Sequence, residues 1–359
     1  MTKQVSSRQT GIIASLILFA NKILVLPSLF YEKSQADGLF MVAILLAFEL
    51  LILYLFLKVK EAYPDQSFYS IIQEKMGTFV AKAFYIILML YFFYKIMLLF
   101  NIIYMYLKVQ VYIDASYYIF IFAFLVIMNT SVLRGIRPIA RGCEFFYVFI
   151  MASLVFCLLL SIANFDKLPI FFDSSLKAFF DGIFRHSFCF GDLLLLFIIM
   201  DKLEVKKKDH KRIFAYISFS VVITLLIYFM FYCIFGVTSF VHKNAVSDIM
   251  TFSYRFIDLG RLDLVAIITI MFLAFFQLSL YAYVFSECFT KVFSKLSFTY
   301  SVVVFDILFV GVVISSLINY LVAIKIGQEF ICYLAILLHL ILPLIVFFFA
   351  KNKQKRRKE

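Results

Sequence analysis

Long apolar stretches separated by short charged connections dominate the sequence. A helix needs about 20 apolar residues to cross the hydrocarbon core of a bilayer, and ten stretches come close to that length or exceed it. They cover residues 11–31, 38–58, 83–107, 115–133, 142–164, 178–200, 213–237, 262–290, 299–321 and 329–350. The pattern predicts an all-α polytopic membrane protein with ten transmembrane helices. A mixed stretch at 65–82 is typical of a helix lying at the membrane surface.

The first stretch, 11–31, carries Asn21 and Lys22 at its middle. A lysine at the centre of a spanning helix costs about 3 kcal/mol on insertion scales. Such a residue faces a cavity, a partner or a substrate path rather than lipid. A second interruption, Phe190-Gly191-Asp192, lies in the stretch at 178–200 and places a flexible glycine next to a charge.

Composition agrees with the membrane assignment. Of the 359 residues, 64% are hydrophobic and 16% are charged, and the mean hydropathy is +1.00. The net charge of +12 could suggest nucleic-acid binding, but the basic residues cluster in short connections, as the positive-inside rule predicts. Most of them lie on one side, so we expect both termini in the cytoplasm. No Gly/Ser-rich linker divides the chain, so we expect one transmembrane domain, 1–359, with a basic cytoplasmic tail at 351–359.

Ten spans divide into two halves of five, about 11–164 and 178–350, which must have opposite orientations. Inverted-repeat transporters are built in this way, and their broken helices form the binding site near the middle of the membrane. Here the first span of each half carries a candidate break. These breaks are Ala20-Asn21-Lys22 and Phe190-Gly191-Asp192.

The depths of the two breaks agree. At 1.5 Å per residue, Lys22 lies roughly 16 Å and Asp192 roughly 12 Å from the cytoplasmic end of its span, so the two side chains could meet. They would form either a gated polar site or a structural ion pair. Lys95 is an alternative partner for Asp192, or it stands where a coupling cation sits in ion-driven transporters.

Several other polar groups lie inside the predicted spans. Candidate binding residues near mid-membrane are Tyr94, Gln277 and Tyr281. Other in-span groups we interpret as structural, because they lie nearer the cytoplasm or on an apolar face: Glu49, Glu287, Asp306 and His339.

Sequence signatures of enzymes are not found. The chain has no G-x-S-x-G, H-E-x-x-H or P-loop motif. No pair of its six cysteines has metal-ligand spacing. We therefore expect no catalytic activity, no cofactor and no metal.

Three short stretches of the chain resemble those of a known family. They are Ser6-Ser7-Arg8-Gln9, Pro27 and above all Gly135-Ile136-Arg137-Pro138-Ile139-Ala140-Arg141, between the fourth and fifth predicted spans. The chain is similar to the integral-membrane B subunit of spore germinant receptors of the GerA type. The Phe-Gly-Asp at 190–192 fits the same resemblance. The resemblance implies a LeuT-like fold of the amino acid–polyamine–organocation transporter superfamily.

The resemblance also implies a function. It is binding of a small nutrient, such as an amino acid, in the inner membrane of a bacterial endospore, with a receptor A subunit and a lipoprotein C subunit as partners. Two alternatives remain open: an ion-coupled amino-acid permease, and a scaffold or channel-forming subunit without a ligand of its own.

Overall fold

The computed structural model describes residues 5–111, 116–165, 168–254, 263–315, 319–341 and 343–349. Within these ranges, a few residues are described by their backbone only: Asn21, Ala163, Ser253, Tyr254 and Leu340. The tail expected at 351–359 lies outside the described residues.

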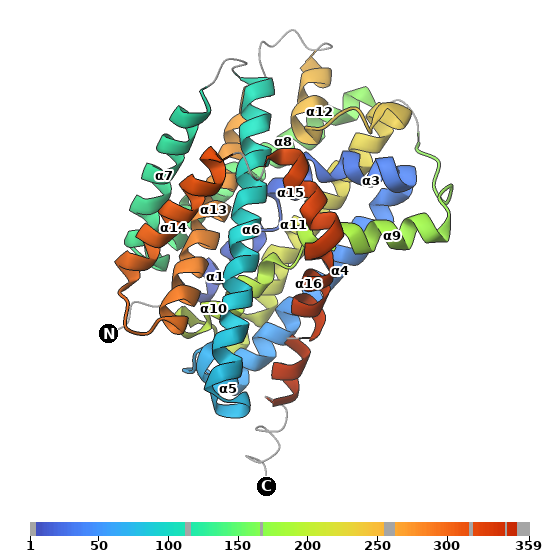
Figure 1. The fold of residues 1–359 in the computed structure, drawn as a ribbon. Helices are drawn as coiled ribbons and strands as arrows, with labels where there is room; N and C mark the ends of the chain where they lie inside the picture. The colour runs from blue at the N-terminus through green and yellow to red at the C-terminus, as the bar shows by residue number, and fades with distance from the viewer. Residues whose placement is uncertain are drawn as a thin grey trace.

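Helices make up most of the described chain (Figure 1). The long ones are α4 (Gly38–Ala62), α6 (Thr78–Gln110), α8 (Ile136–Ser161), α11 (His210–Phe235) and α13 (Asp263–Val292). Shorter ones are α5 (Phe68–Met76), α7 (Tyr117–Leu133), α9 (Leu176–His186), α12 (Ala245–Tyr254) and α14 (Phe298–Ile314).

The first predicted span is divided into three helices, α1 (Ser7–Leu16), α2 (Ala20–Leu24) and α3 (Leu26–Ser34). The side chain of Ser6 accepts a hydrogen bond from the backbone N of Gln9, and the Gln9 side chain accepts one from the N of Ser6. This capping box fixes the start of α1. Pro27 lies in the first turn of α3, where a missing N–H costs nothing.

Short 3-10 turns and two π-helical turns connect or interrupt these helices. The 3-10 turns are η1 (Gln35–Asp37), η2 (Ile162–Asn164), η3 (Ser187–Cys189), η4 (Asp192–Leu194), η5 (Met200–Lys202), η6 (Lys207–Asp209) and η7 (Gly236–Thr238). The sixth predicted span therefore contains only one short helix after α9, α10 (Leu195–Ile198). The C-terminal segment alternates α15 (Tyr320–Ile326), the π turn η8 (Gly327–Ile331), α16 (Cys332–Ile336) and the π turn η9 (Leu337–Ile341).

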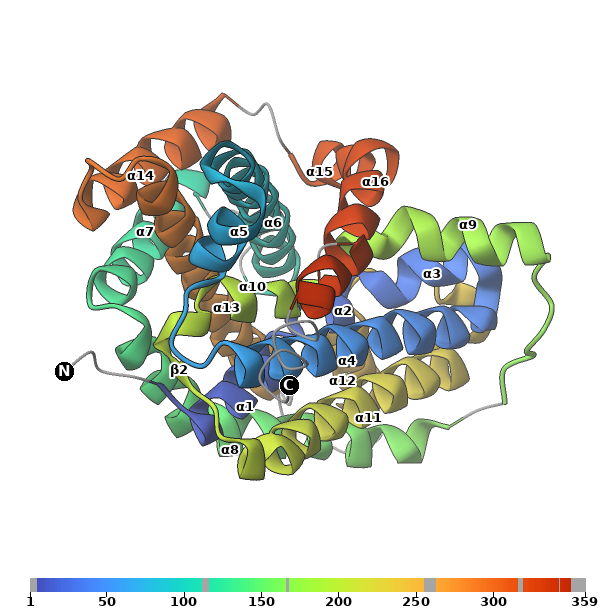
Figure 2. The same cartoon turned by 90° about the horizontal axis from the view of Figure 1, so that it is seen from below.

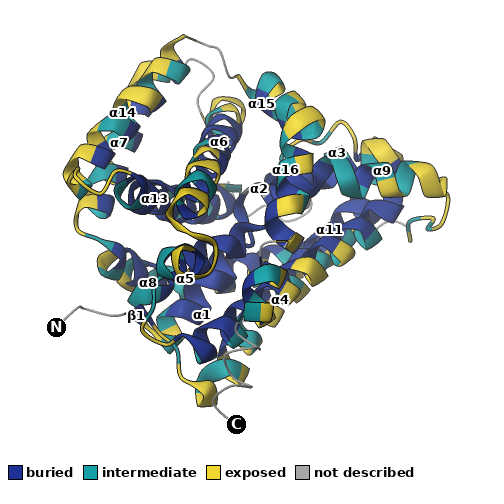
Figure 3. Ribbon diagram, turned by 60° about the horizontal axis from the view of Figure 1, so that its bottom comes forward, coloured by how far each residue is buried: buried dark blue, intermediate teal, exposed yellow. Residues whose placement is uncertain are grey.

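The broken helices lie inside the bundle. Helix α1 packs against α8, α11 and α13, while α13 also packs along α6. Seen from below, α4 and α11 run side by side, and α6 and α13 form a second group with α7 and α14 (Figure 2). Buried residues concentrate on α1, α2 and α13, whereas the outer sides of α7, α9 and α14 are exposed (Figure 3). The exposed faces of α7 and α14 carry large apolar side chains, as expected of a lipid-facing surface.

Six stretches of the described chain are long and apolar enough to cross a membrane, and α7 and α14 are shorter apolar helices. The stretches are Leu26–Ala62, Thr78–Gln110, Ile136–Ser161, Lys207–Thr238, Asp263–Val292 and Tyr320–Phe349. The polytopic helical class is confirmed. The count of ten spans in a 5+5 repeat stays a prediction.

Several predicted boundaries were wrong. The ninth span ends at Ile314 rather than at 321, and the last helical stretch begins at Tyr320 rather than at 329. The basic motif at 135–141 was expected in a connection, but from Ile136 onward it forms the first turns of α8. Gly135, with φ +88°, ends the preceding turn, so the helix starts as soon as the backbone leaves the left-handed region.

A two-residue strand pair was not predicted. Strand β1 (Val5–Ser6) pairs in parallel with β2 (Leu203–Glu204), so the fold is not purely helical. The Ser7 hydroxyl donates to the Glu204 carbonyl oxygen at 2.8 Å. Two residues are too few for the alternating pattern that reveals strands. The pair joins the chain before α1 to the chain that follows the broken sixth span.

Candidate functional site

The break in the first span covers residues 17–19 and reaches Ala20, so it overlaps only the start of the position expected at Ala20-Asn21-Lys22. Ala20 has φ +25°, outside the right-handed helical region, and α2 continues from there through Lys22. Polar side chains suggested the break, but a helix tolerates Asn and Lys, and the interruption lies in an apolar run with no Gly or Pro signal. Buried α11 tyrosines hold this segment: Tyr228 donates to the carbonyl oxygen of Lys22 at 2.9 Å.

The break in the sixth span lies where it was expected. Gly191 has φ +77°, in the left-handed region, between η3 and η4. A Cβ built on Gly191 would overlap the imidazole ring of His339. Backbone conformation and space therefore both require glycine at this position.

Asp192 is the centre of the site. Its carboxylate forms ion pairs with the ammonium groups of both Lys22 and Lys95. The hydroxyl of Tyr281 donates to Asp192 Oδ1 at 2.5 Å. The sequence left open which of the two lysines balances Asp192, and the structure places both against it. These side chains are buried, so their charges interact in a medium of low dielectric constant.

Glu49, which we interpreted from the sequence as a structural residue, is a fourth charged member of the cluster. Its Oε1 accepts the backbone N–H groups of Gly191 at 2.7 Å and Asp192 at 3.2 Å, and its Oε2 accepts that of Leu193 at 3.4 Å. The Lys22 Nζ lies 3.8 Å from Glu49 Oε1. N–H groups at the start of a helical turn lack partners, and a carboxylate is favoured there. A carboxylate inside a membrane helix was itself a signal of function.

A second ring of polar groups surrounds the four charges. The Tyr91 hydroxyl donates to the carbonyl oxygen of Phe190 at 3.0 Å and lies 2.8 Å from Nε2 of His339. Lys95 Nζ donates to the same Phe190 carbonyl at 2.5 Å. His339 was expected to be a core histidine, but it borders the site because the π turn η9 brings it against Gly191.

The other predicted site residues divide into two groups. Gln277 Nε2 donates to the Tyr281 hydroxyl at 2.5 Å, and Gln277 Oε1 has no partner among the described residues. Tyr94 is not part of the cluster, since its hydroxyl donates to the carbonyl oxygen of Ala323 at 2.9 Å. The side chain of Asn21 lies outside what the structure describes.

The remaining in-span acids lie in separate contacts. Glu287 forms an ion pair with Lys202, and Asp306 accepts a hydrogen bond from Asn129 Nδ2 at 2.7 Å. No contact of either with the cluster around Asp192 occurs among the described residues, and their structural role stays a prediction.

A cavity of about 340 Å³ adjoins the cluster. Glu49, Gly191 and His339 line it together with Ser187 and Phe190, and apolar side chains of α4, α9 and α16 complete the lining. The four charged side chains are nearly sealed, with exposed fractions of 0% for Lys22, Glu49 and Asp192 and 2% for Lys95. Two formal positive and two formal negative charges balance inside the site.

Two broken helical segments, meeting inside a membrane bundle with charged groups at the breaks, define a transporter-like membrane protein. Comparison with solved structures shows a similar fold in a transporter. A Na⁺-coupled sialic acid symporter, in a substrate-bound outward-open state, is similar in fold with a TM-score of 0.57 and 12% sequence identity. The match covers 96% of this chain and 75% of the symporter chain. At this identity the likeness concerns the fold.

The family follows from the sequence match. A family model described as spore germination protein, of the spore permease type, matches residues 4–321, and the chain belongs to this family. No curated protein matches the chain significantly.

Proposed function

We propose that this protein is the membrane subunit of a spore germinant receptor, which binds a small nutrient in a transporter-like site and triggers germination with its partner subunits. Family membership supports the germination role. The observation that carries the binding role is the buried cluster of Lys22, Lys95, Asp192 and Glu49 at the two helix breaks. Buried ion pairs stabilise a fold poorly compared with apolar packing, so a sealed four-charge cluster points to a ligand.

The chemistry of the cluster favours a zwitterion such as an amino acid. A ligand carboxylate would pair with Lys22 or Lys95, and a ligand ammonium with Asp192 or Glu49. Because the four formal charges already balance, a ligand without net charge leaves the site neutral, whereas an anion or a cation adds an uncompensated charge to the membrane interior. Binding would exchange internal contacts for ligand contacts, including those between Glu49 and the N–H groups after Gly191.

The wider assignment follows the resemblance to germinant receptors. We propose one transmembrane domain of ten spans in a 5+5 inverted repeat, with both termini in the cytoplasm, in the inner membrane of the endospore. The receptor A and C subunits would be its partners. Copurification of these subunits with a tagged chain tests the partnership, and their absence from a gently solubilised complex would contradict it.

A ligand-screened melting experiment tests the binding role. Purified protein is heated with single amino acids, and the active one is then compared with its N-acetyl and methyl-ester derivatives. We expect the parent amino acid to raise the melting temperature and both derivatives to lose the effect. Asp192→Asn should abolish the shift, whereas Asp306→Asn, a matched change outside the cluster, should retain it. Equal responses to all three compounds would refute a zwitterion site.

One observation favours a second candidate, an ion-coupled amino-acid permease. The Lys95 ammonium binds the Phe190 carbonyl oxygen and the Asp192 carboxylate, which are oxygen ligands of the type that hold coupling cations at broken helices. Uptake of the active amino acid into vesicles separates the two candidates. Binding without accumulation supports the receptor, and accumulation driven by an ion gradient supports the permease.

A further inference from the structure

A groove along α13, remote from the charged cluster, has an apolar end and a cationic end. The apolar end is a cavity of about 530 Å³ between α6, α7 and α13. The cationic end is a cavity of about 290 Å³ that includes Arg134. Phe272 and Phe275 line both cavities, so the two adjoin each other along α13. We propose that this groove is a binding site for an anionic phospholipid, with an acyl chain in the apolar end and the phosphate at Arg134.

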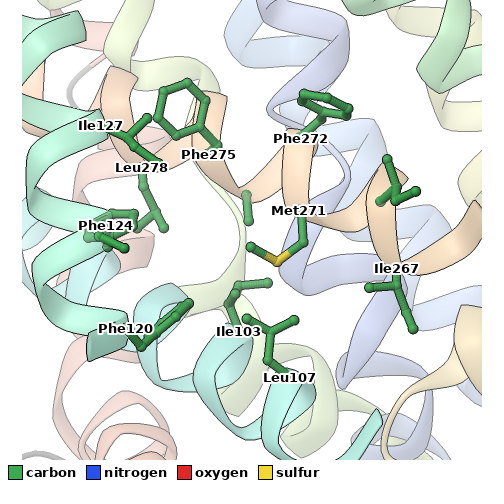
Figure 4. A pocket seen from close by; sticks show the side chains of 13 residues that line it. Ile103, Leu107, Phe120, Phe124, Ile127, Ile267, Met271, Phe272, Phe275 and Leu278 are labelled. Carbon is green, nitrogen blue, oxygen red and sulfur yellow. The ribbon is translucent and has the colours of Figure 1, made fainter. Parts of the chain in front are cut away.

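The apolar end has no polar side chain (Figure 4). Its walls carry only carbon, apart from the sulfur of Met271. Ile127 of α7 and Ile268 of α13 line it and are 49% and 47% exposed, so the cavity opens on the outer, lipid-facing side of the bundle. A polar ligand would lose its hydrogen bonds to water without replacement in such a cavity. A hydrocarbon chain fits its chemistry.

The cationic end supplies hydrogen-bond donors without partners in the described part of the chain. Arg134 is exposed, and no ion pair or hydrogen bond to its guanidinium occurs there. The hydroxyl of Ser279 is buried, lines the same cavity and likewise lacks a described partner. A guanidinium matches the geometry of phosphate oxygens and binds them with charge-assisted hydrogen bonds. Arg137 follows on α8 and strengthens the attraction for an anionic headgroup.

The length of the groove suits a membrane lipid. From Arg134 back to Phe120, at the far end of the apolar cavity, α7 rises about 21 Å at 1.5 Å per residue. The hydrocarbon core of a bilayer is about 30 Å thick. An acyl chain anchored at Arg134 would therefore find an apolar wall along α7 for the whole depth of one leaflet, about 15 Å. A free phosphate ion or a headgroup alone would not fill the apolar end.

The test uses the full-length protein, purified in detergent and stripped of lipid. Phosphatidylglycerol, phosphatidylcholine with identical chains, and chain-free glycerol phosphate are added separately, and binding is measured by native mass spectrometry. Four proteins are compared: the parent, Arg134→Gln, Ala123→Phe, which fills the exposed apolar cavity, and Arg141→Gln, a matched exposed arginine that does not line the groove.

We expect the parent to bind phosphatidylglycerol more tightly than phosphatidylcholine, and glycerol phosphate not at all. Arg134→Gln should weaken phosphatidylglycerol binding about tenfold, to the level of phosphatidylcholine. Ala123→Phe should weaken binding of both lipids, and Arg141→Gln should behave as the parent.

Several outcomes overturn the proposal. If the parent and Arg134→Gln bind phosphatidylglycerol equally, Arg134 does not contact the headgroup. Binding of glycerol phosphate as strong as that of the lipid indicates a phosphate site without a lipid. A photoreactive group at position 127 should crosslink to lipid in membranes, and crosslinking to a protein instead would assign the groove to a partner subunit.

Discussion

Removing single charges from the cluster around Asp192 should destabilise the protein by an amount that depends on the net charge left in the cluster. Asp192→Asn keeps the shape but leaves Lys22 and Lys95 facing Glu49 alone, with one excess positive charge. Lys22→Met leaves one excess negative charge. Breaking a buried ion pair in this way typically costs about 3–5 kcal/mol. The double variant, Lys22→Met with Asp192→Asn, restores a neutral cluster in which Lys95 and Glu49 remain charged.

The structure sets the expected order of these effects. Asp192 contacts two ammonium groups and the Tyr281 hydroxyl, so its replacement should cost more than that of either lysine. When Lys22→Met and Asp192→Asn are combined, the cost should fall well below the sum of the single costs. Lys95→Met combined with Asp192→Asn should behave similarly, because Lys95 contacts the other oxygen of the same carboxylate.

The sequence dictates the assay. The chain has no tryptophan, so intrinsic tryptophan fluorescence cannot report unfolding. All six cysteines are free and buried, and a thiol-reactive dye will label them only as the fold opens. Melting temperatures of the single and double variants, with Asp306→Asn as the control for loss of an intramembrane carboxylate, complete the cycle. If Lys22→Met costs the same in the parent as in the Asp192→Asn variant, the two side chains do not interact and the reasoning fails.

Three further predictions concern the break and the topology. Gly191→Ala should unfold the site, and His339→Ala in the same chain should recover most of the melting temperature. The remaining loss of stability should be about 1–2 kcal/mol, the cost of the left-handed backbone for alanine. No recovery would exclude the His339 clash as the cause. Glu49→Gln should be less harmful than Glu49→Ala, because an amide oxygen still accepts the N–H groups after Gly191; equal melting temperatures would contradict that capping role. A cysteine in place of Lys243 should be labelled by an impermeant reagent from outside the cell, and one in place of Lys206 only after the membrane is opened; the reverse would overturn the orientation.

Much of the site could be predicted, because an isolated charge in an apolar span is conspicuous. Lys22 and Asp192 stood out for this reason, and Gly191 marked the second break. Glu49 was interpreted as structural because its depth in the membrane was counted along a straight helix, which placed it nearer the cytoplasm than the site. The turn at Gly191 releases N–H donors that reach Glu49, and this contact depends on tertiary geometry that residue counting does not contain.

The first break shows a different limit. Residues 17–19 are Ile, Leu and Phe, which carry no turn signal, and their departure from the helix is held by contacts with other elements. The carbonyl of Lys22, for example, is held by Tyr228 of α11. His339 was missed similarly, since π turns have no recognisable pattern in a single sequence and shift the side chains that follow them.

The parallel pair of β1 with β2 links the two broken segments mechanically. Val5 pairs with Leu203, directly before α1 and directly after the sixth span, and Ser7 adds a side-chain bond to Glu204. An outward displacement of one segment at this end must either move the other segment with it or break the hydrogen bonds of the strand pair. The strand pair therefore couples the two segments at this end, while α3 packs against α9 at the other end. Deleting residues 1–6 would remove the strand pair and leave the ion cluster as the remaining charged link between the two segments.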